Sequence, residues 1–268
     1  MITEKLIFKI PYDIPDVPDF STIFGANYYD DWNFNDSGSL VLSGSLIDSV
    51  TSSGLNGAVF SSSGALRPSL VTDAIIGKDV AQFDGVSEFM TIPSSTGMYN
   101  FLHNGSGGCI IAIHRPLSTP ASAALIVNNG GWGVASVGFR HQTNSLLSNN
   151  IIVRNSTSII MLDASTELNI LSEYNSNVNI FDVGQAVAAD KSTVITNAVT
   201  DNNNTSTGTP SVANSTDLMH LGRSSLSPNF YYNMNLARLI IADTIPTPTQ
   251  LAQIQARLIY DYGTFPIS

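Results

Sequence analysis

The stretch VAQFDGVSEFMTIP (residues 80–93) contains two short apolar runs on either side of an Asp-Gly turn. Apolar runs of this length, bounded by residues that favour turns, are typical of half-buried β-strands. The next apolar segment, GGCIIAIHRP (residues 107–116), has the same form and is entered through a pair of glycines. Together these segments predict strands that alternate with tight turns, and they favour an all-β fold.

The same pattern extends in both directions along the chain. GSLVLSGSLIDSV (residues 38–50) precedes these segments, and similar runs follow them as far as ELNILSEY (residues 167–174) and NVNIFDVG (residues 177–184). About a dozen strands in one series predict a two-sheet antiparallel sandwich of the jelly-roll type. The polar stretch over residues 200–216 is expected to be an exposed loop.

One helix is indicated close to the C-terminal end of the sequence. Thr247 and Gln250 have the spacing of a capping box, and Pro248 stands at the first helical position, where its missing N–H costs nothing. This spacing predicts a helix over about residues 248–262, ended by Gly263. One face of that helix carries the apolar residues expected to pack on the sandwich, which are Leu251, Ile254, Leu258 and Tyr262.

The first residues differ in character from the rest. Prolines recur in PYDIPDVPDF (residues 11–20), and each restricts the residue before it, which favours an extended arm over a helix or a central strand. We therefore divide the chain into an extended docking arm (residues 1–27) and a sandwich domain (residues 28–268). The arm could lie over its own domain or dock on a neighbouring subunit, and docking is our hypothesis. Its docking side chains would be Tyr12, Pro15, Val17 and Phe20.

Composition and charge exclude several classes of function. Only 12% of the 268 residues are charged, the net charge is −10, and the 11 basic residues are scattered, so neither a nucleic acid nor an anionic membrane surface is an expected partner. No stretch has the length and apolar character of a membrane span or a secretory signal. Cys109 is the sole cysteine and sits in an apolar run, so we expect a buried thiol and no intrachain disulfide.

No motif indicates an enzyme. None of the four histidines has metal-ligand spacing with another, and no Gly-x-Ser-x-Gly sequence is present. A glycoside hydrolase needs two carboxylates held about 5–10 Å apart. The sequence has only four glutamates, which are Glu4, Glu88, Glu167 and Glu173. We therefore expect no catalytic residues and no cofactor.

Oxygen-bearing side chains are concentrated in YYDDWNFND (residues 28–36). Carboxylate and amide oxygens are the ligands that Ca²⁺ prefers, although the glycine and the glutamate that an EF-hand loop requires are missing here. Ordinary turn and capping hydrogen bonds are the alternative for the same side chains. The candidate calcium ligands are Asp30, Asp31, Asn33, Asn35 and Asp36.

Three aromatic residues near expected loops or strand ends are candidates for binding a sugar. An aromatic ring beside an Asn or Asp side chain can stack on a sugar ring while the polar groups bond to the sugar hydroxyls. Filling of the hydrophobic core is the alternative for each of them. The candidates are Trp132, Tyr231 and Tyr232.

Three segments resemble parts of concanavalin A-like and laminin-G-like domains. Residues 80–93 are similar to the strand–turn–strand element of that fold, in which the Asp-Gly turn makes a tight hairpin, and residues 107–116 are similar to the following strand. LGRSSLSPNFYYNMNLARLIIADTIPTPTQLAQIQARLIYDYG (residues 221–263) resembles the closing strands and helix. The resemblance, over about residues 28–263, implies the sandwich fold and carries over no activity and no ligand residues.

The overall texture of the sequence resembles structural proteins of tailed bacteriophages, with few charges, abundant Ser, Thr and Asn, and a short N-terminal arm. This resemblance implies a non-enzymatic virion protein, made in the host cytoplasm, that displays its sandwich as a capsid decoration, head fibre or tail-fibre component. Its partners would be other virion proteins, copies of itself and host surface glycans. The alternatives are a carbohydrate-binding, lectin-like module and, less favoured, a glycoside hydrolase.

Overall fold

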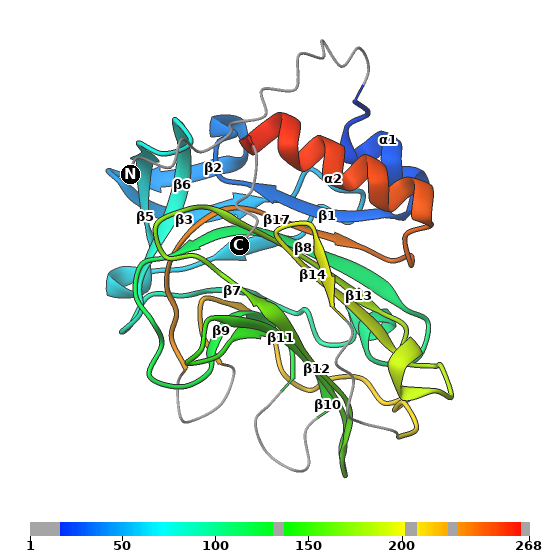
Figure 1. The fold of residues 1–268 in the computed structure, drawn as a ribbon. Coiled ribbons are helices and arrows are strands. Elements are labelled where there is room, and N and C mark those ends of the chain that lie inside the picture. Colours follow the sequence, from blue (N-terminus) through cyan, green and yellow to red (C-terminus); the bar gives the residue numbers. More distant parts are fainter. Residues whose placement is uncertain (1–16, 131–136, 202–207, 225–229, 264–268) are drawn as a thin grey trace.

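The computed structural model describes residues 17–130, 137–201, 208–224 and 230–263. Within them, two layers of antiparallel strands face each other, and two helices lie against the outer face of one layer (Figure 1). The prediction of an all-β sandwich with a C-terminal helix is confirmed. No helix in the described part of the chain has the length and apolar character needed to cross a membrane.

The first layer is built around β17 (Asn233–Ala242). Along one side β17 pairs with β8 (Gly108–Pro116), and along the other it pairs with β1 (Tyr28–Asn33) and β6 (Lys78–Asp84) at its two ends. β5 (Ser69–Asp73) pairs with β6 and extends the layer on that side. Beyond β8 the layer continues through three further strands, which are β13 (Asn175–Phe181), β14 (Ser192–Thr196) and β15 (Val199–Asp201).

The second layer consists of shorter strands and one long hairpin. Its central pair is β9 (Ala124–Asn128) and β10 (Val137–Thr143), and β11 (Ser148–Asn155) follows β10. The two edges are formed by β12 (Ile159–Leu168) beside β11, and by β16 (Met219–Leu221) and β7 (Met90–Ile92) beside β9.

A short ladder joins the two layers. β3 (Leu46–Thr51) pairs with β5 of the first layer and with β4 (Val59–Ser61), which in turn pairs with β7 of the second layer. β2 (Leu40–Ser43) pairs with β3. The strands therefore form one continuous sheet that folds over on itself, and the jelly-roll expectation is confirmed.

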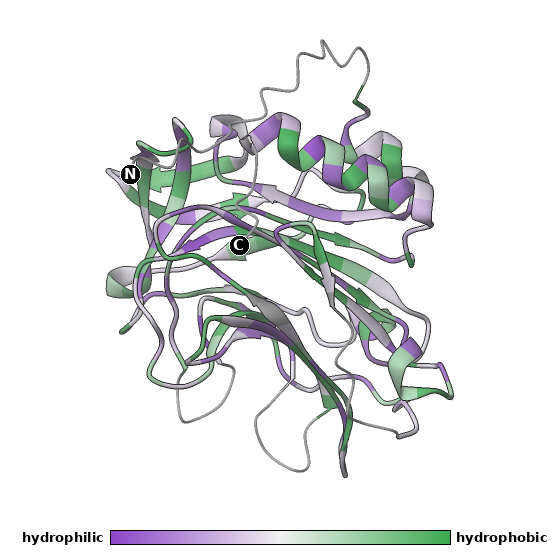
Figure 2. Ribbon diagram, viewed as in Figure 1, coloured by the Kyte–Doolittle hydropathy of each residue, from purple (hydrophilic) through white to green (hydrophobic). Residues whose placement is uncertain are grey.

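Two hydrophobic clusters hold the layers and helices together. The larger cluster lies between the layers, where the rings of Trp32 and Phe60 are 4.7 Å apart and those of Phe139 and Phe181 are 5.8 Å apart. The second cluster lies between the outer face of the first layer and the helices, and includes the buried Cys109. Figure 2 shows hydrophobic residues along the strands of both layers, and hydrophobic and hydrophilic residues alternating along α2 (Pro248–Tyr262).

Helix α2 has the bounds and the cap that the sequence predicts. The Thr247 hydroxyl accepts a hydrogen bond from the backbone N–H of Gln250, and the Gln250 side chain accepts one from the backbone N–H of Thr247 at 3.0 Å. Ile254 and Leu258 are buried in the second cluster. Because all these signals are local, the sequence alone could locate this helix.

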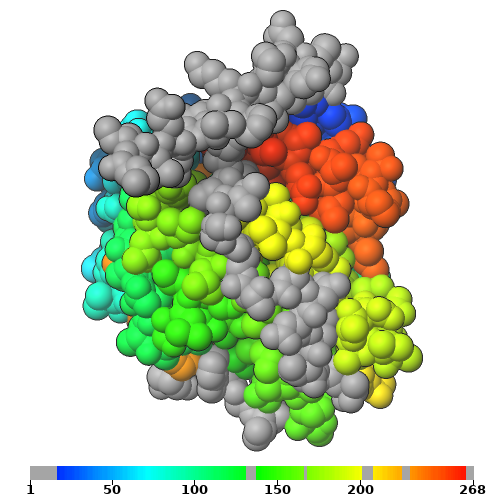
Figure 3. Space-filling model, in the orientation of Figure 1, coloured from blue at the N-terminus to red at the C-terminus, as the bar shows by residue number. Residues whose placement is uncertain are grey.

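The N-terminal docking arm requires a correction. Phe20 begins a short helix, α1 (Phe20–Phe24), which Asp19 caps, and only 1% of Phe20 is exposed because it packs in the second cluster. Figure 3 shows α1, in blue, against α2, in red and orange. Phe20 therefore attaches the chain to its own domain, and it is not a docking side chain for a partner. Val17 is half-buried, and Tyr12 and Pro15 lie outside the described residues.

The Asp-Gly turn does not make a hairpin, contrary to our expectation. β6 ends at Asp84 and β7 begins at Met90, but β6 pairs with β5 and β17 whereas β7 pairs with β4 and β16. The turn carries the chain from the first layer to the second. Gly85 has a φ of +72°, which favours glycine at this sharp change of direction.

The predicted strand over residues 167–174 is also wrong in most of its length. β12 ends at Leu168, and the chain then turns. The amide of Asn175 accepts a hydrogen bond from the N–H of Ile170 at 2.7 Å and donates one to the Ile170 carbonyl at 2.9 Å. These side-chain bonds replace the ladder bonds of a strand, and the sequence LNIL (residues 168–171) gave no sign of them.

Candidate functional site

A depression of about 240 Å³ opens where three connections between the layers meet. Gly85 comes from the β6–β7 turn, residues 118–123 from the β8–β9 loop, and residues 230–233 from the segment that leads into β17. Each connection joins a strand of one layer to a strand of the other. The depression therefore lies at one margin of the sandwich, and it brings together residues that are more than a hundred positions apart in the sequence.

Hydrogen bonds to Asn233 fix the shape of this depression. The side-chain amide of Asn233 donates a hydrogen bond to the Ser118 hydroxyl at 3.2 Å. The backbone carbonyl of Asn233 accepts one from the backbone N–H of Leu117 at 2.9 Å. A Cβ atom on Gly85 would lie 2.6 Å from the Cβ of Asn233, so only glycine allows the two segments to approach so closely. The loop and the strand end are thereby held as one surface.

The two adjacent tyrosines predicted to bind a sugar have different environments. Tyr231 is half-buried and lines the depression, next to Asn233. Tyr232 also borders it, but only 1% of Tyr232 is exposed and its ring packs in the core between the layers, where it contacts His114 edge-on. Tyr232 is therefore a core residue, and that part of the prediction is wrong. Trp132 lies outside the described residues.

Two carboxylates of the β6–β7 turn stabilise that turn. Asp84 accepts hydrogen bonds from the backbone N–H groups of Val86, Ser87 and Glu88 at 2.8–3.0 Å, and these bonds lower its pKa although burial alone would raise it. Burial, reinforced by the negative charge of Asp84, raises the pKa of Glu88 to about 7. Neither carboxylate lines the depression.

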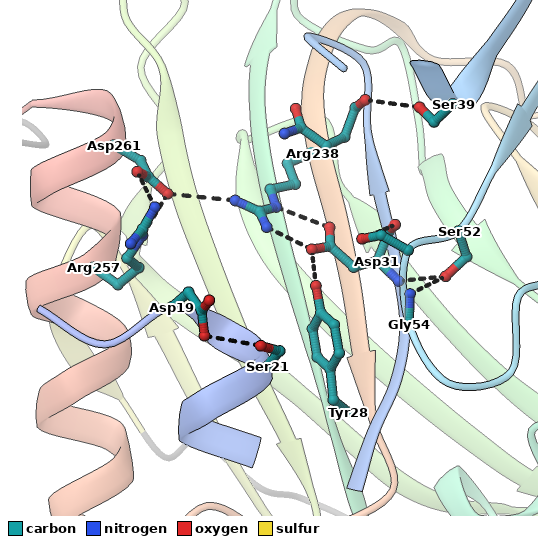
Figure 4. A network of polar contacts seen from close by, with 12 residues as sticks. Asp19, Ser21, Tyr28, Asp31, Ser39, Ser52, Gly54, Arg238, Arg257 and Asp261 are labelled. Carbon is teal, nitrogen blue, oxygen red and sulfur yellow. Dashed lines mark hydrogen bonds and ion pairs between the residues drawn. The ribbon is translucent and has the colours of Figure 1, made fainter. Parts of the chain in front are cut away.

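The candidate calcium ligands Asp30 and Asp31 do not converge. They are neighbours on β1, so their side chains point to opposite faces of the sheet. Asp30 accepts hydrogen bonds from Tyr99 and Asn56, each at 2.8 Å, whereas Asp31 accepts one from Arg238 Nε at 2.8 Å on the other face (Figure 4). The protein's own donors take up these carboxylate oxygens.

The remaining candidate ligands stabilise the turn that follows β1. Asn33 Oδ1 accepts from the N–H of Asn35 at 3.1 Å, Asp36 Oδ1 accepts from the N–H of Gly38 at 3.0 Å, and Asn35 Oδ1 accepts from the N–H of Asp79 at 3.0 Å. The five residues therefore form no common site. Local turn bonds account for Asn33 and Asp36, whereas Asp30, Asp31 and Asn35 bond to distant segments of the protein. The described residues include no group of three or more His, Cys, Asp or Glu side chains that could hold a metal ion.

A polar layer between the two sheets was not predicted. Asn177 and Asn179 point inward from β13, where Asn179 accepts a hydrogen bond from Asn149 of β11 at 2.9 Å, and Asn177 contacts His114 of β8 at 2.8 Å. The members, all 0% exposed, are His114, His141, Thr143, Asn149, Asn177, Asn179 and Thr196. The alternation of Asn with Val and Ile in NVNIF (residues 177–181) was the available signal, because period-two alternation places every Asn on one face.

The histidines of this polar layer are neutral. Burial lowers the pKa of His114 to about 3, with a further contribution from nearby His141. Burial also lowers the pKa of His141 to about 3, against a weaker opposing contribution from the side chain of Asn149. Among the described residues, neither ring nitrogen of His141 has a partner in hydrogen-bonding geometry. His114 and His141 are therefore core groups.

Comparison with solved structures supports the fold. The chain is similar to a Trypanosoma rangeli sialidase in complex with sialic acid, with 12% identity and a TM-score of 0.58, over 91% of this chain and 34% of that one. It is similar to the binding domain of botulinum neurotoxin DC in complex with SialylT, with 9% identity and a TM-score of 0.57, over 89% of this chain and 53% of that one. At such identities the likeness shows the fold alone, which is a concanavalin A-like jelly-roll sandwich.

This chain spans about a third of the sialidase and about half of the toxin's binding domain. No protein-family model matches the sequence, and no curated protein matches it either. The expected concanavalin A-like fold is confirmed, whereas these comparisons give no support to a bacteriophage origin.

Proposed function

We propose that this protein is a non-enzymatic, lectin-like module that binds glycans at the depression lined by Tyr231. The observation that carries the proposal is that the half-buried Tyr231 lines an open depression together with Asn233 and Ser118, whose side chains are hydrogen-bonded to each other. An aromatic surface with a few fixed polar groups is the usual composition of a small-molecule site. The apolar face of a sugar can lie on the ring while its hydroxyls bond to the amide and hydroxyl groups.

The comparisons favour this function over the virion role. The sialidase and the toxin domain share the sandwich, and both were solved with a sialic acid or SialylT bound. Their likeness supports glycan binding as a function suited to this fold, and the lectin-like alternative becomes our leading proposal. Display on a bacteriophage particle is a separate prediction about location, which rests on composition and resemblance alone.

A glycan array probed with the purified full chain tests the proposal. We expect binding to a subset of glycans, and we expect Tyr231→Ala to weaken that binding about tenfold or more, because the stacking surface is lost. Tyr260→Ala is the matched control, since Tyr260 is 64% exposed on α2 and does not line the depression. Equal losses in both variants, or no glycan binding by the wild-type chain, would contradict the proposal.

A further inference from the structure

We infer that the depression takes a neutral sugar residue and discriminates against sialylated and other acidic glycans; this inference rests on the proposed function. Within the part of the chain that the structure describes, the polar side chains that line it are all uncharged. Apart from the core residue Tyr232, they are the hydroxyls of Ser118, Thr119, Ser122 and Tyr231 and the amide of Asn233. These groups can donate and accept hydrogen bonds with sugar hydroxyls, and none supplies a positive charge.

An acidic sugar requires a cationic side chain, and none lines this depression among the described residues. Proteins bind carboxylates through charge-assisted hydrogen bonds, most often from arginine, and a carboxylate moved out of water without such a partner is strongly disfavoured. No Arg, Lys or His is among the described residues that line the depression.

None of the arginines in the described residues lines the depression. Four of them pair with carboxylates outside the depression, as Arg67–Asp48, Arg115–Asp73, Arg238–Asp31 and Arg257–Asp261. The guanidinium of Arg223 lies 3.4 Å from the centre of the Phe89 ring. Arg140 and Arg154 are on β10 and β11, and they do not line the depression.

The net charge of the whole chain also disfavours binding of an acidic glycan. A net charge of −10 gives the protein a negative field that disfavours the approach of an anionic glycan. The volume adds a limit on size, because about 240 Å³ is below the roughly 300–1,000 Å³ of typical ligand pockets. A single neutral sugar ring on Tyr231 fits these constraints, although the two similar structures were solved with sialic acid or SialylT.

Matched pairs of neutral and α2,3-sialylated glycans, differing only in the terminal sialic acid, test the inference with the full chain. We expect the wild-type protein to bind the neutral member of a recognised pair about tenfold tighter or more. Thr119→Arg places a cation at the exposed rim of the depression, and we expect it to narrow that difference. Ser45→Arg is the control, because it adds the same charge at an exposed position that does not line the depression.

The outcomes separate the inference from the function on which it rests. Tighter binding of the sialylated members would overturn the inference and leave glycan binding intact. Equal narrowing by Thr119→Arg and Ser45→Arg would also overturn it, because discrimination would then come from net charge and not from the depression. Absence of binding to every glycan would overturn the proposed function itself.

Discussion

Asp31 connects three elements through one buried carboxylate. It accepts hydrogen bonds from Arg238 of β17 and from the Tyr28 hydroxyl, and Arg238 also reaches Asp261 of α2 at 3.3 Å (Figure 4). Burial works to lower the pKa of Arg238, but the hydrogen bonds and the charge of Asp31 outweigh it, so the pKa is raised. The guanidinium is therefore charged inside the protein, and its stability there depends on Asp31.

Replacement of Asp31 tests this dependence. We expect Asp31→Asn to lower the free energy of unfolding by about 3–5 kcal/mol, because the buried Arg238 charge loses its main partner and keeps only the 3.3 Å contact with Asp261. Asp261→Asn should cost less, since Asp261 is partly exposed and makes the longer contact with Arg238. Urea unfolding of both variants measures the difference, and losses of equal size would show that Asp31 has no special role.

At the scale of elements, the two helices differ in what makes them helical. The cap, the apolar stripe and the terminal glycine of α2 are all encoded within its own segment. α1 has only five residues, which is too short to be helical without tertiary contacts. It is held by burial of Phe20 and Phe24, and by a hydrogen bond from the Gln250 side chain of α2 to the Ile23 carbonyl at 2.7 Å.

Truncation of Phe20 distinguishes attachment to the domain from docking on a partner. We expect Phe20→Ala to destabilise the isolated protein by about 3–5 kcal/mol, because a fully buried aromatic ring is removed. Val17→Ala should cost much less, since Val17 is only half-buried. Thermal unfolding of the purified variants measures both effects, and an unchanged melting temperature for Phe20→Ala would favour the docking hypothesis again.

At the scale of the whole molecule, two kinds of contact fill the space between the sheets. Apolar side chains pack there, and the side chains of the polar layer form hydrogen bonds. The bonds from Asn149 to Asn179 and from Asn177 to His114 have directions, so they specify how the elements that carry them are aligned. Hydrophobic packing alone would tolerate small shifts of one layer over the other. We attribute the alignment of the layers to both contributions.

Acid should weaken the sandwich through this polar layer. The folded pKa of His141 is about 3, below the roughly 6.5 of an unfolded histidine, so the unfolded chain binds a proton that the folded protein does not. The resulting stability is fully present above about pH 6.5 and is lost as the pH falls, by up to about 1.4 kcal/mol per pH unit for each such histidine.

Comparison with a variant isolates this effect. The difference in unfolding free energy between wild type and His141→Asn should change by about 1 kcal/mol per pH unit between roughly pH 6 and pH 4.5. Subtraction removes the contributions of distant groups such as Glu88, whose raised pKa acts in the opposite direction. Parallel pH profiles for the two proteins would show that His141 is not responsible.

The sequence by itself determined the features that depend on neighbouring residues. Apolar runs bounded by turn residues indicated the strands and the sandwich, and the capping box and apolar stripe located α2, because each signal lies within a few residues. The sequence also indicated Tyr231 as a surface aromatic next to an asparagine. It could not separate Tyr231 from Tyr232, because their burial depends on which layer and which loops surround them.

Only the tertiary structure decided the features that depend on distant residues. The Asp-Gly turn crosses between layers because β6 pairs with β5 and β17 in one layer, whereas β7 pairs with β16 in the other. Asp30 and Asp31, adjacent in sequence, face apart, whereas Gly85, Ser118 and Asn233 meet in one depression. Burial and hydrogen bonding between remote segments set these outcomes, and no local pattern in the sequence records them.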